Sequence, residues 1–284
     1  MLVTLKEILK DTVEKGYAVG AFDTTEHPFA EYIIEAAENQ NKPVIMMVPG
    51  FAFGSRYDEE FYTYLVQRIK EAKVPICLHL DHGASFEEVM KAIHFGFSGV
   101  MIDGSALPNE ENIALTKKVV EAAHACGVSV EAEIGHVAGA EATFNGGVAD
   151  ESCYTKVEDA VQFVKETNVD ALAVAIGTVH GVYKGTPKLD LQRLDEIRAA
   201  VDIPLVMHGG SGLQQSDYEN VVAHGINKIN YFTEMSLAAV KAMGDAIQAK
   251  NGKMHFPEAL GAAEKAVVEI IERQIKVFKT EELS

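Results

Sequence analysis

The chain of 284 residues lacks tryptophan and has only three cysteines, Cys77, Cys126 and Cys153. They are odd in number, far apart and without a CxxC pair, which excludes a disulfide framework and a cysteine-rich metal site. No apolar run approaches the roughly 20 residues of a membrane helix. The amphipathic, acid-containing start "MLVTLKEILKDTVEKG" is typical of neither a signal nor a transit peptide. We therefore predict a reduced protein in the cytoplasm.

Basic residues are scarce. Lysine and arginine number 25 against 42 aspartates and glutamates, which gives a formal charge of −17. Nucleic acids and anionic membranes both require a basic surface, so neither is expected as a partner. An anionic substrate would have to be held by local donors, a metal ion or a few lysines against this unfavourable field.

The chain also lacks low-complexity tracts, long linkers and Pro/Ser-rich hinges, while 48% of its residues are hydrophobic. Short apolar runs alternate with helical patterns, which predicts parallel strands. The eight runs are 17–23, 43–48, 76–81, 99–103, 129–134, 171–176, 204–209 and 228–232. Eight such units predict an α/β fold, a (β/α)8 TIM barrel in one domain over residues 1–284. The tail "FPEALGAAEKAVVEIIERQIKVF" predicts a C-terminal helical extension.

A doubly wound open sheet is the alternative architecture. It normally has fewer strands and a glycine-rich turn after the first one. The segment after the first run here, "AVGAFDTTEHP", contains no GxGxxG. The pattern therefore favours the barrel.

Polar residues occur where the apolar runs end, which is the rim that carries the active site in such barrels. They are Asp23, Asp81, His82, Asp103, Glu131, Glu133, His180, His208 and Asn230. A single histidine at a strand end is usually structural, but three on one rim favour a metal site. His82, His180 and His208 are the predicted ligands of a catalytic Zn²⁺ with one open position. His79, two residues before Asp81, is expected to support them.

A phosphate site is predicted beside these histidines. The segment "HGGSGLQQSD" follows the seventh run, and its Gly209, Gly210 and Ser211 let backbone N–H groups approach a ligand. Loops after strands 7 and 8 often bind phosphate in barrels. Asn230 and Thr233 of "NYFTEMS" add donors, and Lys184, with Lys188 nearby, adds charge close to the predicted metal.

A long loop, "GHVAGAEATFNGGVADESCYT", separates the fifth run from the helix that begins at Val157. Loops of this length are uncommon in compact domains and are often lids. Glu141 is its acid–base candidate, because a carboxylate that enters a closed site loses solvent and gains a raised pKa. Asp150 and Glu151 are the alternatives, with helix capping or solvation as their expected roles.

The motifs together resemble a known family. They are "LHLDHG", "SVEAEIGHVAGAE", "DALAVAIGTVHGVYKG", "PLVMHGGSG" and "KINYFTE". This pattern is similar to class II, zinc-dependent ketose-bisphosphate aldolases, in the fructose- and tagatose-bisphosphate branch. The resemblance implies that the three histidines bind zinc, that Asp81 acts on the C4 oxygen and that Glu141 exchanges a proton at C3.

The resemblance also implies the remaining parts of the site. Residues matching the cradle for the ketose 1-phosphate are Gly181, Gly209, Ser211, Asn230 and Thr233. Asp103 and Glu133 match acids near the metal, in a supporting or second-site position. A homodimer or homotetramer and a monovalent cation such as Na⁺ or K⁺ are further family expectations.

The predicted function is the reversible aldol cleavage of a phosphorylated ketose to dihydroxyacetone phosphate and an aldehyde. Breaking a C–C bond beside a carbonyl leaves a carbanion, and a metal ion acting as a Lewis acid accommodates its charge. Three alternatives stay open: a metal-dependent sugar-phosphate epimerase or isomerase, an aldolase with a non-standard aldehyde, and a barrel that binds a sugar phosphate without turnover.

Three departures from the family pattern leave the substrate open. Asp23 stands where asparagine is usual, and the predicted lid has Glu141 alone where a second acid is usual. Tyr231 and Phe232 occupy positions where small or acidic residues are preferred. We expect Phe232 to narrow the pocket beside the phosphate cradle.

Overall fold

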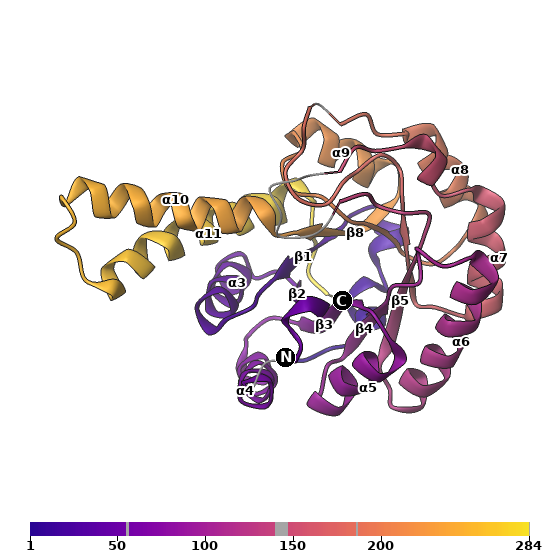
Figure 1. The fold of residues 1–284 in the computed structure, drawn as a ribbon, viewed down its shortest axis with the longest axis horizontal. Helices are drawn as coiled ribbons and strands as arrows, with labels where there is room; N and C mark the ends of the chain where they lie inside the picture. The colour runs from indigo at the N-terminus through magenta and orange to yellow at the C-terminus, as the bar shows by residue number, and fades with distance from the viewer. Residues whose placement is uncertain (55–56, 140–146, 186, 284) are drawn as a thin grey trace.

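The computed structural model describes residues 1–54, 57–139, 147–185 and 187–283. Its eight parallel strands pair in chain order and β8 pairs with β1, so the sheet closes into a barrel (Figure 1). The strands are β1 (Val19–Asp23), β2 (Val44–Pro49), β3 (Ile76–Gly83), β4 (Gly99–Ile102), β5 (Ser129–Ile134), β6 (Ala171–Val174), β7 (Leu205–Met207) and β8 (Ile226–Tyr231). The predicted (β/α)8 barrel is confirmed.

Helices form a ring outside the strands (Figure 1). Those of the described ranges are α1 (Leu5–Leu9), α2 (Thr12–Lys15), α3 (His27–Gln40), α4 (Asp58–Glu71), α5 (Phe86–Phe95), α6 (Asn109–Ala125), α7 (Val157–Thr167), α8 (Leu191–Ala200), α9 (Gln215–Ala223), α10 (Thr233–Ala249) and α11 (Phe256–Val277). Two 3₁₀ turns, η1 (Gly50–Ala52) and η2 (Glu151–Cys153), lie in the connections after β2 and β5. Both connections run over the end of the barrel that carries the polar strand ends.

Alternation along the strands divides the buried side chains into two sets. Outward-facing residues pack against the surrounding helices in one large cluster. Inward-facing ones, such as Val19 and Ala21 of β1, form a smaller cluster with Leu5 and Ile8 of α1. Helix α1 therefore covers the N-terminal end of the barrel.

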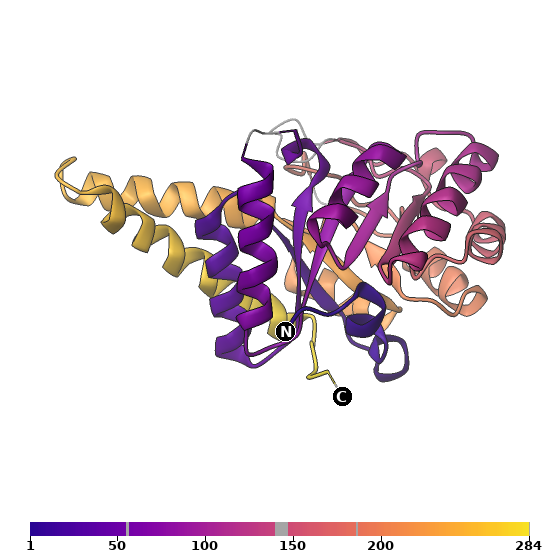
Figure 2. The same ribbon diagram turned by 90° about the horizontal axis from the view of Figure 1, so that it is seen from below.

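The C-terminal helical extension is also confirmed. Helices α10 and α11 pack against each other as a hairpin, and its far end projects well beyond the barrel (Figure 2). The base of α11 packs on α3. Several large apolar side chains on this hairpin are exposed: Leu237, Val240, Ile247 and Phe256.

Cys77, Cys126 and Cys153 are free thiols, as the sequence predicts. Among the residues that the structure describes, no helix combines the length and apolar character that crossing a bilayer requires.

Candidate metal centre and active site

The end of β3 carries the polar residues that open the site. Asp81 lies on the same inward face as Cys77 and His79, in keeping with strand alternation. The pairing of β3 with β4 shifts between Leu80 and Gly83, and His82 has a φ of 107°. Such a conformation is uncommon outside glycine and clusters at functional sites. At this irregularity the imidazole of His82 lines the pocket at the barrel mouth, and the strand ends at Gly83, two residues beyond the predicted end at Asp81.

The three predicted histidine ligands lie together at the mouth. His180 comes from the connection after β6, and His208 directly follows β7. One ring nitrogen from each of the three histidines lies within 4.8 Å of the others. The ring centroids of His82 and His208 are 4.6 Å apart, and those of His82 and His180 are 5.3 Å apart. Segments from three separate strands thus supply one set of nitrogen donors.

Hydrogen bonds orient two of the imidazoles. His82 Nδ1–H donates to Asp103 Oδ2 at 2.9 Å, and His208 Nε2–H donates to Glu131 Oε1 at 2.9 Å. His82 Nε2 and His208 Nδ1 are therefore the nitrogens on the ligand side. Within the described residues, the buried Nδ1 of His208 forms no hydrogen bond. A carboxylate behind a histidine, with its other nitrogen left for a ligand, is the arrangement of metal sites.

Two of the three histidines, His180 and His208, are neutral over a wide pH range. Burial, aided by the nearby His82, lowers the pKa of His180 to about 4. Burial also holds the pKa of His208 well below its usual value, again with a contribution from His82. Metal ions bind neutral imidazole, so these depressed pKa values favour binding of a cation. The donor set and its protonation both fit a divalent metal ion.

Asp81 is buried beside this centre and is held by Asn230. Its Oδ1 accepts a hydrogen bond from Asn230 Nδ2 at 2.9 Å, and its Oδ2 is 3.9 Å from His82 Nε2. Burial alone would raise its pKa, but the neighbouring His82 and His208 hold the pKa below the usual value. The carboxylate is therefore ionised and able to accept a proton at the edge of the metal centre.

Asp103 and Glu133 form a second group with His82, again with ligand atoms within 4.8 Å. Burial would raise the pKa of Asp103, but the hydrogen bond from His82 and its charge hold it well below its usual range. Burial, and next the charge of Asp103, raise the pKa of Glu133 to about 8. The two predicted second-site acids therefore lie where the sequence analysis expects them, one charged and one tending to be neutral.

Beneath the histidines lies a buried ionic network that the sequence analysis missed in part. Lys228 of β8 is fully buried, and its Nζ lies 2.9 Å from Glu131 Oε2 of β5. The same ammonium donates to Asn230 Oδ1 at 2.7 Å. His79 Nε2 is 3.5 Å from Glu131 Oε2, and burial lowers the pKa of His79 to about 3. Lys228 thus connects Glu131, which orients His208, with Asn230, which holds Asp81.

One signal in the sequence points to this network. Lys228 and Asn230 are two residues apart in the apolar run of β8, so alternation puts both on the same face. A lysine inside a strand that is buried on both faces requires a partner there.

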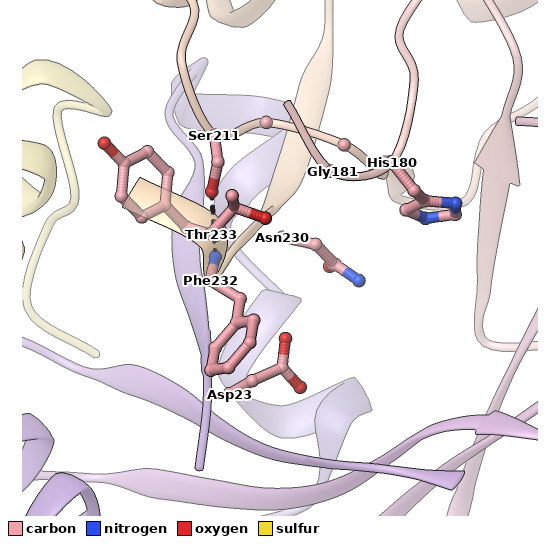
Figure 3. Close-up of a pocket in the computed structure, with 10 residues that line it drawn as sticks. Asp23, His180, Gly181, Ser211, Asn230, Phe232 and Thr233 are labelled. Carbon is pink, nitrogen blue, oxygen red and sulfur yellow. Dashed lines mark hydrogen bonds between the residues drawn. The ribbon is translucent and has the colours of Figure 1, made fainter. Parts of the chain in front are cut away.

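The predicted phosphate cradle is a pocket beside the metal centre (Figure 3). It is lined by Gly181, Gly209, Gly210, Ser211, Asn230 and Thr233, together with His180. Gly209 has a φ of 65°, and a Cβ there would lie 2.3 Å from the carbonyl oxygen of Val179. Only glycine fits this close approach. Helix α10 begins at Thr233, so its N-terminal dipole adds positive potential to the pocket.

Lys184 does not belong to this pocket. It lies in an adjoining pocket with Lys188, and its side chain is exposed. The sequence placed it near the cradle because it follows His180 by four residues. The chain turns at Gly181, which has a φ of 81°, and carries Lys184 to the surface.

Asp23 and Phe232 complete the wall of the cradle pocket. The ring of Phe232 lies beside the Asp23 carboxylate, as Figure 3 shows. The backbone N–H of Phe232 donates to Ser211 Oγ at 2.9 Å. Tyr231 points the other way, since Gln274 Nε2 of α11 donates to its hydroxyl at 2.8 Å. Of the two aromatic departures, the Phe232 side chain is therefore the one that faces the site.

Glu141, the predicted acid–base group of the long loop, lies outside the described residues. Of its two alternatives, Asp150 caps η2, because its Oδ1 accepts a hydrogen bond from the Ser152 N–H at 2.9 Å. This agrees with the capping role expected for Asp150.

Comparison with known proteins decides the family. The model of the family "Fructose-bisphosphate aldolase class-II" matches residues 3–282. The chain belongs to this family. It is 42% identical to the fructose-bisphosphate aldolase of Staphylococcus aureus (strain Mu50) over 285 residues, which is 98% of each chain. It is 41% identical to the probable fructose-bisphosphate aldolase of Bacillus subtilis (strain 168), over 98% of this chain and 97% of that one.

The fold agrees with this membership. The crystal structure of the YdjI aldolase from Escherichia coli K12 superimposes with a TM-score of 0.87 and 35% identity. That match covers 99% of this chain and 98% of the other. The protein is therefore a class II aldolase, a lyase built on a TIM barrel.

Proposed function

We propose that this aldolase cleaves a phosphorylated ketose reversibly to dihydroxyacetone phosphate and an aldehyde, with zinc bound by His82, His180 and His208. The observation that carries the proposal is the group of three imidazoles whose ligand nitrogens lie within 4.8 Å of one another, next to an ionised carboxylate and a glycine-lined cradle. Zinc is borderline-soft and takes three protein ligands with an open position in catalytic sites. Bound there, it would act as a Lewis acid toward the substrate carbonyl.

The side chains of the protein have distinct tasks in this mechanism. The phosphate lies in the cradle, where the backbone N–H groups near Gly209, the Thr233 hydroxyl and the start of α10 hold it. Asp81 accepts the proton of the C4 hydroxyl, and the C3–C4 bond then breaks. The far half leaves as an aldehyde. Glu141 returns a proton to C3, which yields dihydroxyacetone phosphate.

Supporting groups keep these residues in place. Asp103 holds the His82 ring, and Glu131 holds the ring of His208. Asp103 and Glu133 offer a second position for the metal ion beside His82. Lys184 contributes at most long-range charge, since its side chain is exposed in the adjoining pocket.

The assembly and setting are further parts of the proposal. A homodimer or homotetramer is supported by the exposed apolar side chains of the projecting α10–α11 hairpin, because such patches mark interaction sites. Residues 1–284 as one barrel domain, a cytoplasmic location, and a monovalent cation such as Na⁺ or K⁺ stay predictions.

Removal of the metal is expected to abolish cleavage. Fructose 1,6-bisphosphate, tagatose 1,6-bisphosphate and ketose 1-phosphates are supplied to the purified enzyme, and dihydroxyacetone phosphate is measured through a coupled dehydrogenase. We expect activity on at least one of these substrates, its loss after chelation, and its return with Zn²⁺. Interconversion of epimeric ketoses without release of triose phosphate would show that the enzyme acts as an epimerase and not as an aldolase. Absence of turnover on the whole panel would indicate a binding protein.

A further inference from the structure

A second pocket lies next to the phosphate cradle and is lined by His82 and His180 together with Asp103 and Glu133. It encloses about 430 Å³ and shares His180 with the cradle pocket. A ketose whose phosphate lies in the cradle and whose C4 hydroxyl meets Asp81 spans the histidines and extends its remaining carbons in this direction. The chemistry of these walls therefore selects the aldehyde half of the substrate.

The walls around the far end of the substrate combine acids, imidazoles and an aromatic ring. The second pocket is lined by the carboxyl groups of Asp103 and Glu133, the exposed ring of Phe51, and the imidazoles of His82, His136 and His180. Among the residues described, no lysine or arginine lines it, and none lines the cradle pocket. The lysines that line the adjoining pockets, Lys184, Lys188 and Lys241, belong to the connection after β6 and to α10.

Asp23 adds a carboxylate at the end of β1. Its side chain is 1% exposed and lines the cradle pocket together with the Phe232 ring (Figure 3). A carboxylate accepts hydrogen bonds from sugar hydroxyls, whereas it repels a phosphate dianion. A second phosphate in the second pocket would therefore meet the carboxyl groups of Asp103 and Glu133 and, among the described residues that line it, no lysine or arginine.

We propose that the aldehyde half of the substrate carries no phosphate: the ketose is phosphorylated at C1 only, its far carbons bear free hydroxyl groups, and Asp23 accepts a hydrogen bond from one of them. This inference rests on the proposed function. In cleavage the C3–C4 bond breaks, the C4 hydroxyl proton passes to Asp81, C4 leaves as an uncharged polyhydroxy aldehyde, and C3 receives a proton.

Aldol condensation with matched aldehydes tests the proposal. The zinc-loaded enzyme is supplied with dihydroxyacetone phosphate and either D-glyceraldehyde or D-glyceraldehyde 3-phosphate, and with either D-erythrose or erythrose 4-phosphate. We expect kcat/KM to be about tenfold or more higher for the unphosphorylated member of each pair, because like charges brought together in a site are unfavourable. A preference for the phosphorylated members would overturn the inference and leave the proposed function intact. Condensation with none of the four would overturn both.

The variant Asp23→Asn separates a specificity role from a structural one. It is expected to raise kcat/KM for the phosphorylated aldehydes about tenfold and to lower it for the unphosphorylated ones, since one negative charge is removed. Glu87→Gln removes the same charge from the exposed first turn of α5 and is expected to change neither value. Equal loss on both aldehyde classes would show that Asp23 serves the fold only and would contradict its assigned role.

Discussion

Replacing Asp81 by asparagine is expected to lower kcat/KM for ketose cleavage about 1,000-fold, within the range that a positioned general base contributes. The substitution removes the proton acceptor and keeps the shape of the side chain. The Oδ1 atom of the new residue still accepts the hydrogen bond that Asn230 Nδ2 now donates to Asp81 at 2.9 Å. The effect should therefore appear in kcat, with little change in the KM for the phosphorylated substrate.

The half-reaction provides a sharper readout for the same variant. Asp81 is assigned to the C4 oxygen, and dihydroxyacetone phosphate alone has no C4. Exchange of its C3 proton with D₂O should therefore persist in Asp81→Asn while cleavage is lost. Loss of exchange and cleavage to the same degree would mean that Asp81 serves the metal centre as a whole. A kcat/KM for cleavage within about threefold of the wild-type value would show that Asp81 is not the general base.

Replacing Lys228 by methionine is expected to destabilise the protein by about 3–5 kcal/mol, the usual cost of leaving one member of a buried ion pair alone. Glu131, fully buried, would lose the ammonium that now lies 2.9 Å from it. Urea-induced unfolding followed by circular dichroism measures the change. A difference below about 0.5 kcal/mol, typical of surface substitutions, would contradict the buried pairing.

The double variant Lys228→Met with Glu131→Gln is the matched control. It removes both charges, so a large part of the lost stability should return. Activity should return only in part, because the amide oxygen of the new side chain accepts from His208 Nε2 more weakly than the carboxylate does. Changes to such a partner typically weaken metal binding by about 10–100-fold. Zinc affinity measured by competition with a chelator separates this effect from folding.

The barrel and most of its rim could be predicted from the order of residues alone. Apolar runs at regular intervals require parallel strands covered on both faces, and closure of eight strands brings their ends onto one rim. His82, His180 and His208 meet there, although His82 and His208 are 126 residues apart in the sequence (208 − 82). Local pattern is sufficient because each residue ends a strand or lies in the connection that follows one.

Other features depend on contacts that no local pattern contains. The network of Lys228 and Glu131 joins positions 97 residues apart, and it exists only because the barrel brings the inward faces of β5 and β8 together. The sequence pattern predicts the end of β3 two residues early, because it contains no sign of the shifted pairing with β4 at which His82 adopts a φ of 107°. Proximity to His180 predicts that Lys184 lies at the cradle, but the turn at Gly181 directs it outward.

Proton exchange at C3 of dihydroxyacetone phosphate tests the central claim most directly, because it requires the metal and the cradle but no aldehyde. The zinc-loaded enzyme in D₂O should incorporate one deuteron into the hydroxymethyl group, as followed by proton NMR. Chelation, or the variant His208→Ala, should remove the exchange, and Zn²⁺ should restore it to the chelated wild-type enzyme only. Exchange that survives complete removal of the metal, or zinc-loaded wild-type enzyme that produces none, would contradict metal-assisted carbanion chemistry at these three histidines.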